Sequence, residues 1–187
     1  DYNERVRVPR GFRLDSPASR RQWRTASGKA QFIVYESGDQ RPLARDGVAD
    51  ALVLATIRSH DQYNTTIYGK NDRYRGITGR RDVVFVNALD LAERGLAHGD
   101  VIDIEAVAAC EGDGARRIIR DFVAVEYDIA RGSVAAYYPG ANGLIALANF
   151  DRQSGTPSYK SVPVVLRRAQ SGAAAIDVGR QEDVAAA

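Results

Sequence analysis

The sequence predicts a mainly β fold, a closed barrel with one or two short helices. Short apolar runs recur along the chain, glycine-rich turns separate them, and no long helical pattern lies between them. Many short strands divided by tight turns are typical of β-barrels. The lack of long helices between strands argues against a dinucleotide-binding Rossmann sheet, which needs such helices.

Each element of this barrel follows from a local pattern. Strands are predicted at residues 31–35, 51–56, 83–86, 101–107, 118–127, 133–138 and 162–167, where apolar runs lie between turn formers. Asn87 suits a helix N-cap, and residues 88–94 suit a short helix that ends at Gly95. Turns are expected at residues 99–100 and 111–114, and a short helical turn near residues 19–23.

The chain divides into three segments by composition. Residues 1–29 are polar and arginine-rich and are expected to form a lead segment or linker. Residues 30–168 are expected to form the barrel domain, and residues 169–187 a flexible tail. The chain starts at Asp1 and contains no methionine, so we expect a fragment or a processed chain. No apolar run approaches the roughly 20 residues that a membrane span needs.

Charge and cysteine content limit the classes of function. A net charge of +2 is too small to indicate a polyanionic partner such as nucleic acid. Cys110 is the only cysteine, and His60 and His98 are the only histidines. One cysteine cannot form an internal disulfide or carry an iron–sulfur cluster, so we expect no metal site in this chain.

A dense polar loop follows the strand predicted at residues 51–56. Its hydroxyl and amide side chains include Thr56, Ser59, Gln62, Asn64 and Thr65. Arg58 adds a planar cation suited to phosphate, and His60 can donate or accept a hydrogen bond. Such a loop could cradle a pyrophosphate and a polar heterocycle, although a run of turn formers is often only a loop. A Ser59–His60–Asp61 triad is disfavoured because adjacent side chains of an extended chain point in different directions.

Four stretches of the chain resemble one known family. Residues 54–66, Leu-Ala-Thr-Ile-Arg-Ser-His-Asp-Gln-Tyr-Asn-Thr-Thr, resemble the opening of the molybdopterin-dinucleotide-binding domain of formate-dehydrogenase-like oxidoreductases, nearest to the YdeP-like branch. Residues 27–32 resemble the short Gly-Lys-Ala segment that precedes this domain, and residues 87–104 and Asn142 with residues 151–160 resemble later elements of it, in the same order.

The resemblance implies a fold, a cofactor and a set of binding residues. The fold is a double-psi β-barrel, and the cofactor is molybdopterin guanine dinucleotide, whose molybdenum is held by the rest of the parent enzyme. The implied cofactor-binding residues are Thr56, Arg58, Ser59, His60, Gln62, Asn64 and Thr65 in the early loop, and Asn142, Tyr159 and Lys160 in the late element.

The resemblance also implies what this chain does not do alone. The preceding domains of the parent oxidoreductase are the expected partners and hold the molybdenum ligand. We therefore expect no catalytic residue in this chain and no turnover by it. A cytoplasmic location is expected, although a removed export signal would leave no trace.

One alternative stays open, a small β-barrel that binds single-stranded nucleic acid or protein. Its stacking surface would combine tyrosines with arginines, namely Tyr63, Tyr68, Tyr74, Tyr137 and Tyr138 with Arg73, Arg75, Arg80 and Arg81. Nearby acids, Asp61, Asp72 and Asp82, match these arginines. We therefore favour the interpretation that the tyrosines pack on the barrel with a solvated hydroxyl.

Overall fold

A computed structural model describes residues 13, 16–32, 48–60, 62, 69–107, 115–152 and 154–178. The chain divides into two units, residues 1–41 and 42–187, and each is described by itself. In the first unit, the short 3₁₀ helix η1, Pro17–Arg20, has no buried residue. It starts before the predicted turn at 19–23, because proline suits the first position of a helix. Residues 31 and 32 are not in a strand, and the rest of the strand predicted there lies outside the described residues.

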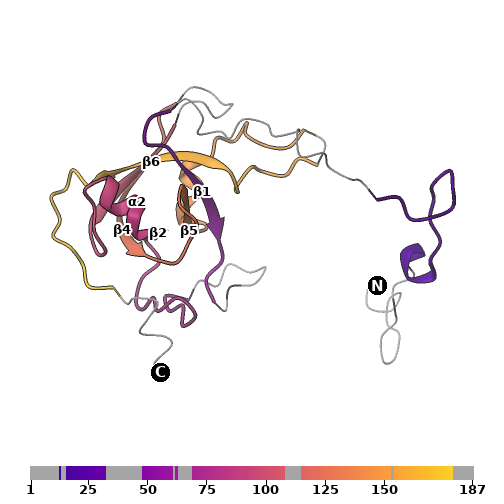
Figure 1. Ribbon diagram of the computed structural model, residues 1–187, viewed down its shortest axis with the longest axis horizontal. Coiled ribbons are helices and arrows are strands. Elements are labelled where there is room, and N and C mark those ends of the chain that lie inside the picture. The colour runs from indigo at the N-terminus through magenta and orange to yellow at the C-terminus, as the bar shows by residue number, and fades with distance from the viewer. Residues whose placement is uncertain are drawn as a thin grey trace, which may run out of the picture. The chain divides into compact units, whose positions relative to one another are not determined.

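The second unit contains a closed barrel of six strands (Figure 1). Its strands are β1 Leu52–Ile57, β2 Val83–Val86, β3 Val101–Ala106, β4 Ile118–Glu126, β5 Ser133–Tyr137 and β6 Val162–Arg168. Around the barrel they follow the order β1-β5-β2-β4-β3-β6, with β1–β5 and β2–β4 parallel and the other pairs antiparallel. The predicted mainly-β barrel is confirmed, and its crossed strand order agrees with the double-psi barrel that the resemblance implies.

The strands bury side chains on both faces. Alternate residues of all six strands fill the barrel interior, for example Leu54, Val84 and Ile102. The other face of β2 contributes Val83 and Phe85 to a second, outer cluster. This outer cluster is covered by residues outside the strands, and β2 is therefore buried at every position.

The helix α2, Ala88–Glu93, forms where the sequence predicts it. The side chain of Asn87 accepts a hydrogen bond from the backbone N–H of Leu89 at 3.0 Å, which confirms the predicted N-cap. Gly95 follows the helix with φ +63°, the left-handed conformation that commonly ends a helix. Among the described residues, no helix is both long and apolar enough to cross a membrane.

The described part of the C-terminal segment runs back along the barrel. The backbone N–H of Ile176 donates to the oxygen of Gly99 at 2.8 Å, and Val178 is buried in the outer cluster. His98 Nδ1 accepts from the backbone N–H of Glu126, so Nε2 carries the proton and donates to the oxygen of Val178 at 2.8 Å. The domain end predicted at residue 168 stays a prediction, and these contacts favour extending the domain to Val178.

Replacing Gly99 by alanine is expected to destabilise the barrel by about 2 kcal/mol. Gly99 has φ +88°, and a Cβ there would lie 2.6 Å from the backbone oxygen of Ile176. The C-terminal segment would have to shift, since a backbone oxygen cannot rotate away. Gly95→Ala is the matched control, because Gly95 also has positive φ but has no atom within 4 Å of the added Cβ. Equal urea midpoints for the two variants would contradict the close approach of Ile176.

Candidate functional site

The predicted site residues converge at one end of the barrel. β1 and β5 are parallel and in register at Ile57 and Tyr137, so both strands finish at the same end. β6 is antiparallel to β1 and starts opposite Leu54, so its beginning lies there too. We call this the site end. It brings together residues 58–60 and 62 after β1, the 3₁₀ helix η2 (Gly140–Leu144) after β5, and residues 158–160 before β6.

The late element of the predicted site is bound to the end of β1. The backbone N–H of Thr56 donates to the oxygen of Tyr159 at 3.0 Å. The ammonium of Lys160 donates to the oxygen of Thr56. The structure thus brings three predicted residues, separated by about a hundred positions, into direct contact. The side chain of Thr56 is buried, whereas Lys160 is exposed.

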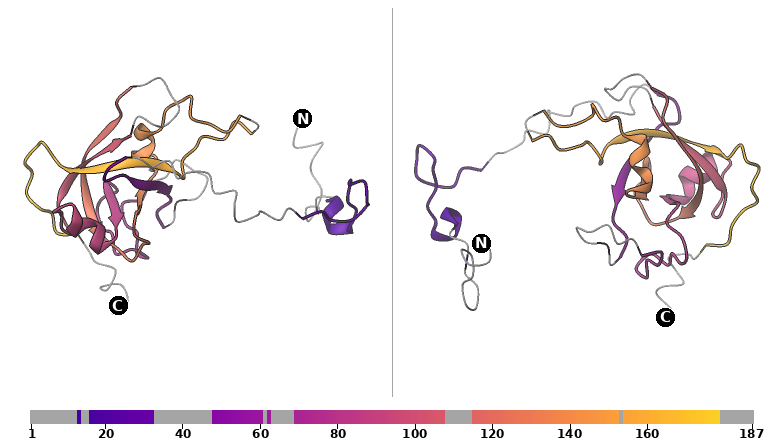
Figure 2. Two further views of the ribbon diagram at one scale, coloured as in Figure 1. Left: turned by 45° about the horizontal axis from the view of Figure 1, so that its top comes forward. Right: turned by 180° about the vertical axis from the view of Figure 1, so that it is seen from behind.

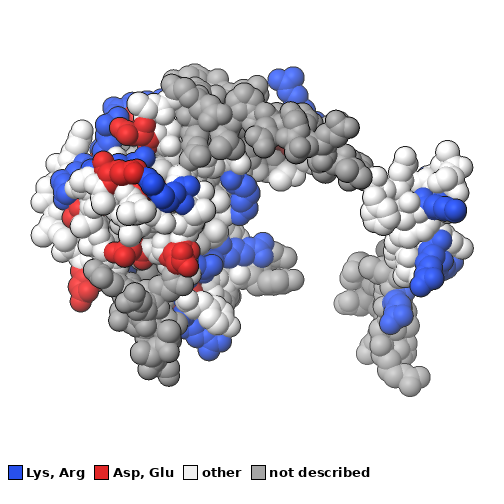
Figure 3. All heavy atoms as spheres, viewed as in Figure 1, with Lys and Arg blue, Asp and Glu red and all other residues white. Residues whose placement is uncertain are grey.

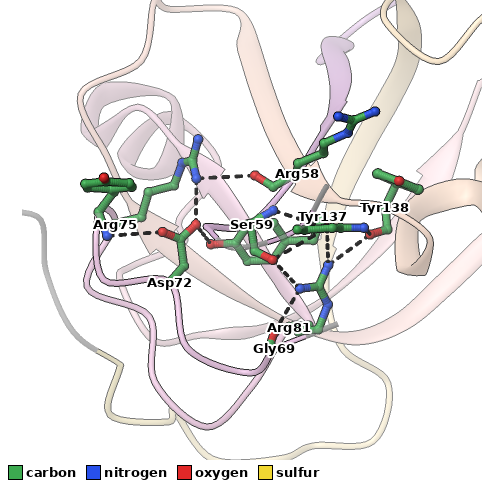
Figure 4. A network of polar contacts seen from close by, with 10 residues as sticks. Arg58, Ser59, Gly69, Asp72, Arg75, Arg81, Tyr137 and Tyr138 are labelled. Carbon is green, nitrogen blue, oxygen red and sulfur yellow. Dashed lines mark hydrogen bonds and ion pairs between the residues drawn. The ribbon is translucent and has the colours of Figure 1, made fainter. Parts of the chain in front are cut away.

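Ser59 and Gln62 are held by Arg81, a residue that the predicted site did not include (Figure 4). One terminal nitrogen of Arg81 donates to Ser59 Oγ and to the oxygen of Gly69. The other donates to Gln62 Oε1 at 2.9 Å and to the oxygen of Tyr138 at 3.0 Å. Ser59 and Gln62 are both buried, so these bonds fix the start of the loop. Their contact with a cofactor stays a prediction.

Arg58 has a different environment from Ser59. Its side chain is exposed and, in Figure 4, points away from the network around Arg81. Its backbone oxygen accepts from Arg75 at 3.4 Å, which holds the backbone while the guanidinium extends outward. The ring of half-buried His60 packs edge-on against Tyr74, with 4.1 Å between ring centroids. The predicted residues Asn64 and Thr65 lie outside the described residues.

Asn142 lies in η2, next to the end of β5. Its side-chain oxygen is buried and has no hydrogen-bond partner among the described residues. A buried acceptor without a donor costs roughly 1–3 kcal/mol. A ligand N–H that reached this oxygen would recover that free energy. This chemistry suits an amide that recognises a polar heterocycle, and the cofactor contact that the resemblance implies for Asn142 stays a prediction.

A buried ionic group lies at the end of β5 (Figure 4). The Asp72 side chain is only 1% exposed, and its carboxylate accepts from Tyr137 Oη at 2.7 Å and from Arg75 at 2.5 Å. Burial by itself raises the pKa of Asp72, but these two hydrogen bonds and the charge of Arg75 outweigh burial, and the pKa is lowered. Burial, followed by the hydrogen bond to Asp72, raises the pKa of Tyr137 well above its usual value. Asp72 therefore stays ionised and Tyr137 protonated at neutral pH.

The tyrosines and arginines of the alternative binding surface are mostly engaged within the protein. Tyr137 is 1% exposed, so its predicted packing on the barrel is confirmed, but the solvated hydroxyl is wrong because Asp72 binds it. Arg80 pairs with Asp82 at 2.5 Å, as the matching of charges suggested. On the barrel face seen in Figure 3, acidic and basic side chains are interleaved. Tyr63 and Tyr68 lie outside the described residues. Among the described tyrosines of this surface, only Tyr74, with the Arg73 guanidinium 5.3 Å from its ring centroid, keeps the exposed arrangement that stacking needs.

Two hollows in the described surface lie away from the predicted site residues. One, of about 60 Å³, lies among charged side chains of β3, β4 and β6, including Asp103, Glu105 and Arg120. The other lies between α2 and the start of β1, beside Asp90 and Arg94. The charged residues that line both hollows are already bound to one another in ion pairs or to a helix end. We therefore do not assign the cofactor site to either hollow, and place it where the three segments of the site end converge.

Comparison with known proteins identifies the family. Residues 52–163 match the family described as Molydopterin dinucleotide binding domain, and the chain belongs to this family. It is 43% identical over 166 residues to Protein YdeP of Escherichia coli K12, covering 89% of this chain and 22% of that protein. It is 46% identical over 170 residues to the "Uncharacterized oxidoreductase Rv2900c" of Mycobacterium tuberculosis H37Rv, covering 89% of this chain and 21% of that protein. The chain thus spans about a fifth of the length of these relatives.

These matches confirm three of the predictions. The family is the molybdopterin-dinucleotide-binding domain, the fold is a mainly-β barrel, and the cofactor is molybdopterin guanine dinucleotide. The matched range starts at the first residue of β1 and includes all three segments of the site end. Which residues bind the cofactor stays a prediction.

Proposed function

We propose that this chain is the cofactor-holding domain of a larger, formate-dehydrogenase-like molybdopterin oxidoreductase. The observation that supports this proposal best is the convergence of residues 58–60 and 62, η2 and residues 158–160 at the site end. In this proposal the preceding domains of the parent polypeptide are the partners and hold the molybdenum. The chain alone catalyses no turnover, and the parent works in the cytoplasm.

The donors and acceptors at the site end fit such a cofactor. A diphosphate requires cations and N–H donors, and exposed Arg58 and Lys160 provide two cationic side chains. A pterin or guanine edge carries both donors and acceptors, which the amide of Asn142 can match in either sense. When bound, the cofactor supplies the redox chemistry, and the residues of this chain bind and orient its nucleotide-bearing part.

Arg58→Ala is expected to reduce affinity for the cofactor by about ten- to a hundredfold, because a charge-assisted contact is worth roughly 1.5–3 kcal/mol. The fold should tolerate the change, since the side chain is exposed. The measurement is the molybdopterin dinucleotide content of the purified parent enzyme, together with the melting temperature of this chain. Arg167→Ala, which removes an exposed arginine near the far end of β6, is the control. Full cofactor content in Arg58→Ala would remove this residue from the site, whereas a large loss of melting temperature would make it structural.

A further inference from the structure

A hairpin arm projects from the site end of the barrel. We define the arm as residues 146–158, between η2 and the late element of the site. Its two limbs are joined at Phe150 and Pro157, and by hydrogen bonds from Asp151 N to Thr156 O at 2.8 Å and from Ser158 N to Asn149 O at 3.0 Å. Figures 1 and 2 show this orange segment extending away from the barrel in each of three views.

The arm exposes apolar side chains to an unusual degree. Leu147 is 99% exposed and Phe150 is 46% exposed. Two-stranded hairpins are marginally stable in water unless a face packs on something else. The arm therefore has two properties of a docking element, an extended shape and uncovered apolar groups.

Both ends of the arm are fixed to the site end. On one side, Ala146, the first residue of the arm, is buried just after η2. On the other side, Tyr159 and Lys160 bond to the backbone of Thr56 at the end of β1. The base of the arm therefore lies next to the end of β1.

We propose that the arm docks on the part of the parent polypeptide outside this chain, which covers Leu147 and Phe150 and closes the cofactor site. The inference rests on the proposed function. Relatives that match this chain are about five times as long, so most of such a polypeptide is available as the docking surface. Because the arm leads directly into Tyr159 and Lys160, the docked surface would lie next to these two proposed binding residues. The arm then orders the cofactor site by joining the two parts.

The test uses the double substitution Leu147→Asp with Phe150→Ser in the full-length parent. Leu89→Asp is the matched control, because Leu89 is also exposed, at 58%, but lies on α2 after the end of β2, away from the site end. Release of the C-terminal domain by limited trypsin digestion is the measurement. We expect the arm variant to release the domain at least about tenfold faster than wild type, and the control to behave as wild type. The same substitutions in the chain alone should leave its melting temperature unchanged, since neither Leu147 nor Phe150 belongs to a core cluster of the barrel.

The possible outcomes separate this inference from the proposed function. An arm variant that keeps the wild-type digestion rate would overturn the docking proposal. Self-association of the chain in sedimentation, abolished by the arm variant, would also overturn it, because a second copy would then be the partner. A wild-type parent that contains no molybdopterin dinucleotide would refute the proposed function. The digestion rate would still report on the arm, because it does not depend on the cofactor.

Discussion

Replacing Asp72 by asparagine is expected to destabilise the chain by about 3–4 kcal/mol, near the lower end of what breaking a buried ion pair costs. Asp72 is almost completely buried, and the substitution removes the negative charge that faces Arg75 and weakens the hydrogen bond from Tyr137. The Arg75 side chain is 27% exposed, so water can solvate its guanidinium when the carboxylate is removed. We therefore expect a smaller loss of stability than for an ion pair in which both partners are fully buried. Urea denaturation of wild type and variant at pH 7 is the measurement.

The same substitution predicts a change in the dependence of stability on pH. The pKa of Asp72 is lower in the folded chain than in the unfolded chain, so the folded state binds fewer protons. Stability from this group is therefore fully present above about pH 4 and is lost as the pH falls further. The difference between wild type and Asp72→Asn should shrink as the pH is lowered through that range.

Asp82→Asn is the matched control for Asp72→Asn. Asp82 also pairs with an arginine, Arg80, but its side chain is 46% exposed. An exposed ion pair contributes about 1 kcal/mol or less. If both variants lost the same stability, the structural role assigned to the Asp72 group would be wrong.

The strands of the barrel were predictable because each carries its own local signal. The predicted bounds of the six strands in the barrel agree with the structure to within one residue at either end. Each buried strand needs a run of apolar residues, and turn formers mark its two ends, so every strand leaves the same pattern in the sequence. Asn87 and Gly95 mark the limits of α2 for an equally local reason, since a helix end needs an acceptor or a left-handed residue.

The partners of the site residues were not predictable in the same way. The contact of Thr56 with Tyr159 and Lys160 depends on β6 returning beside β1, which no local pattern specifies. The resemblance to a family nominated both segments, but it did not nominate Arg81. Arg81 was noticed only as one of several arginines near tyrosines, and its sequence neighbours give no sign that it reaches Ser59, 22 positions away.

The packing of the C-terminal segment also could not be predicted from local sequence patterns. The small and polar residues of this segment predict a loose tail, yet Val178 packs on the outer cluster and accepts a hydrogen bond from His98. Val178 and its apolar neighbour Ile176 are too few to give a periodic signal in this stretch of small and polar residues. The burial of Val178 depends on the outer face of β2, where Phe85 belongs to the same cluster. Such burial can be recognised only when the strands are assembled.

Arg81→Leu is expected to have the largest effect on the cofactor site, exceeding a hundredfold loss of cofactor affinity, or about 3 kcal/mol. The guanidinium of Arg81 binds four oxygens, including Ser59 Oγ and Gln62 Oε1, and lies 5.0 Å from the ring centroid of Tyr137. Without it each of these acceptors loses one donor, although Gln62 Oε1 and the oxygen of Tyr138 each keep another, and a buried acceptor left unpaired costs roughly 1–3 kcal/mol. We therefore expect the loop to open by admitting water, which would displace Arg58 from its position.

The conservative variant Arg81→Lys separates positioning from charge. Lysine keeps the positive charge, but one ammonium group cannot reproduce the planar fork that reaches four acceptors. If Arg81 acts by holding the loop, Arg81→Lys should lose cofactor nearly as fully as Arg81→Leu. The backbone amide of Gln62 donates to the oxygen of Ser59 at 3.2 Å, and its hydrogen exchange should accelerate in both variants. Arg80→Leu is the control, because it removes a neighbouring arginine paired only with Asp82 among the contacts described above. Wild-type cofactor content in Arg81→Lys would instead show that the site needs only a cation here, and the positioning role of Arg81 would have to be abandoned.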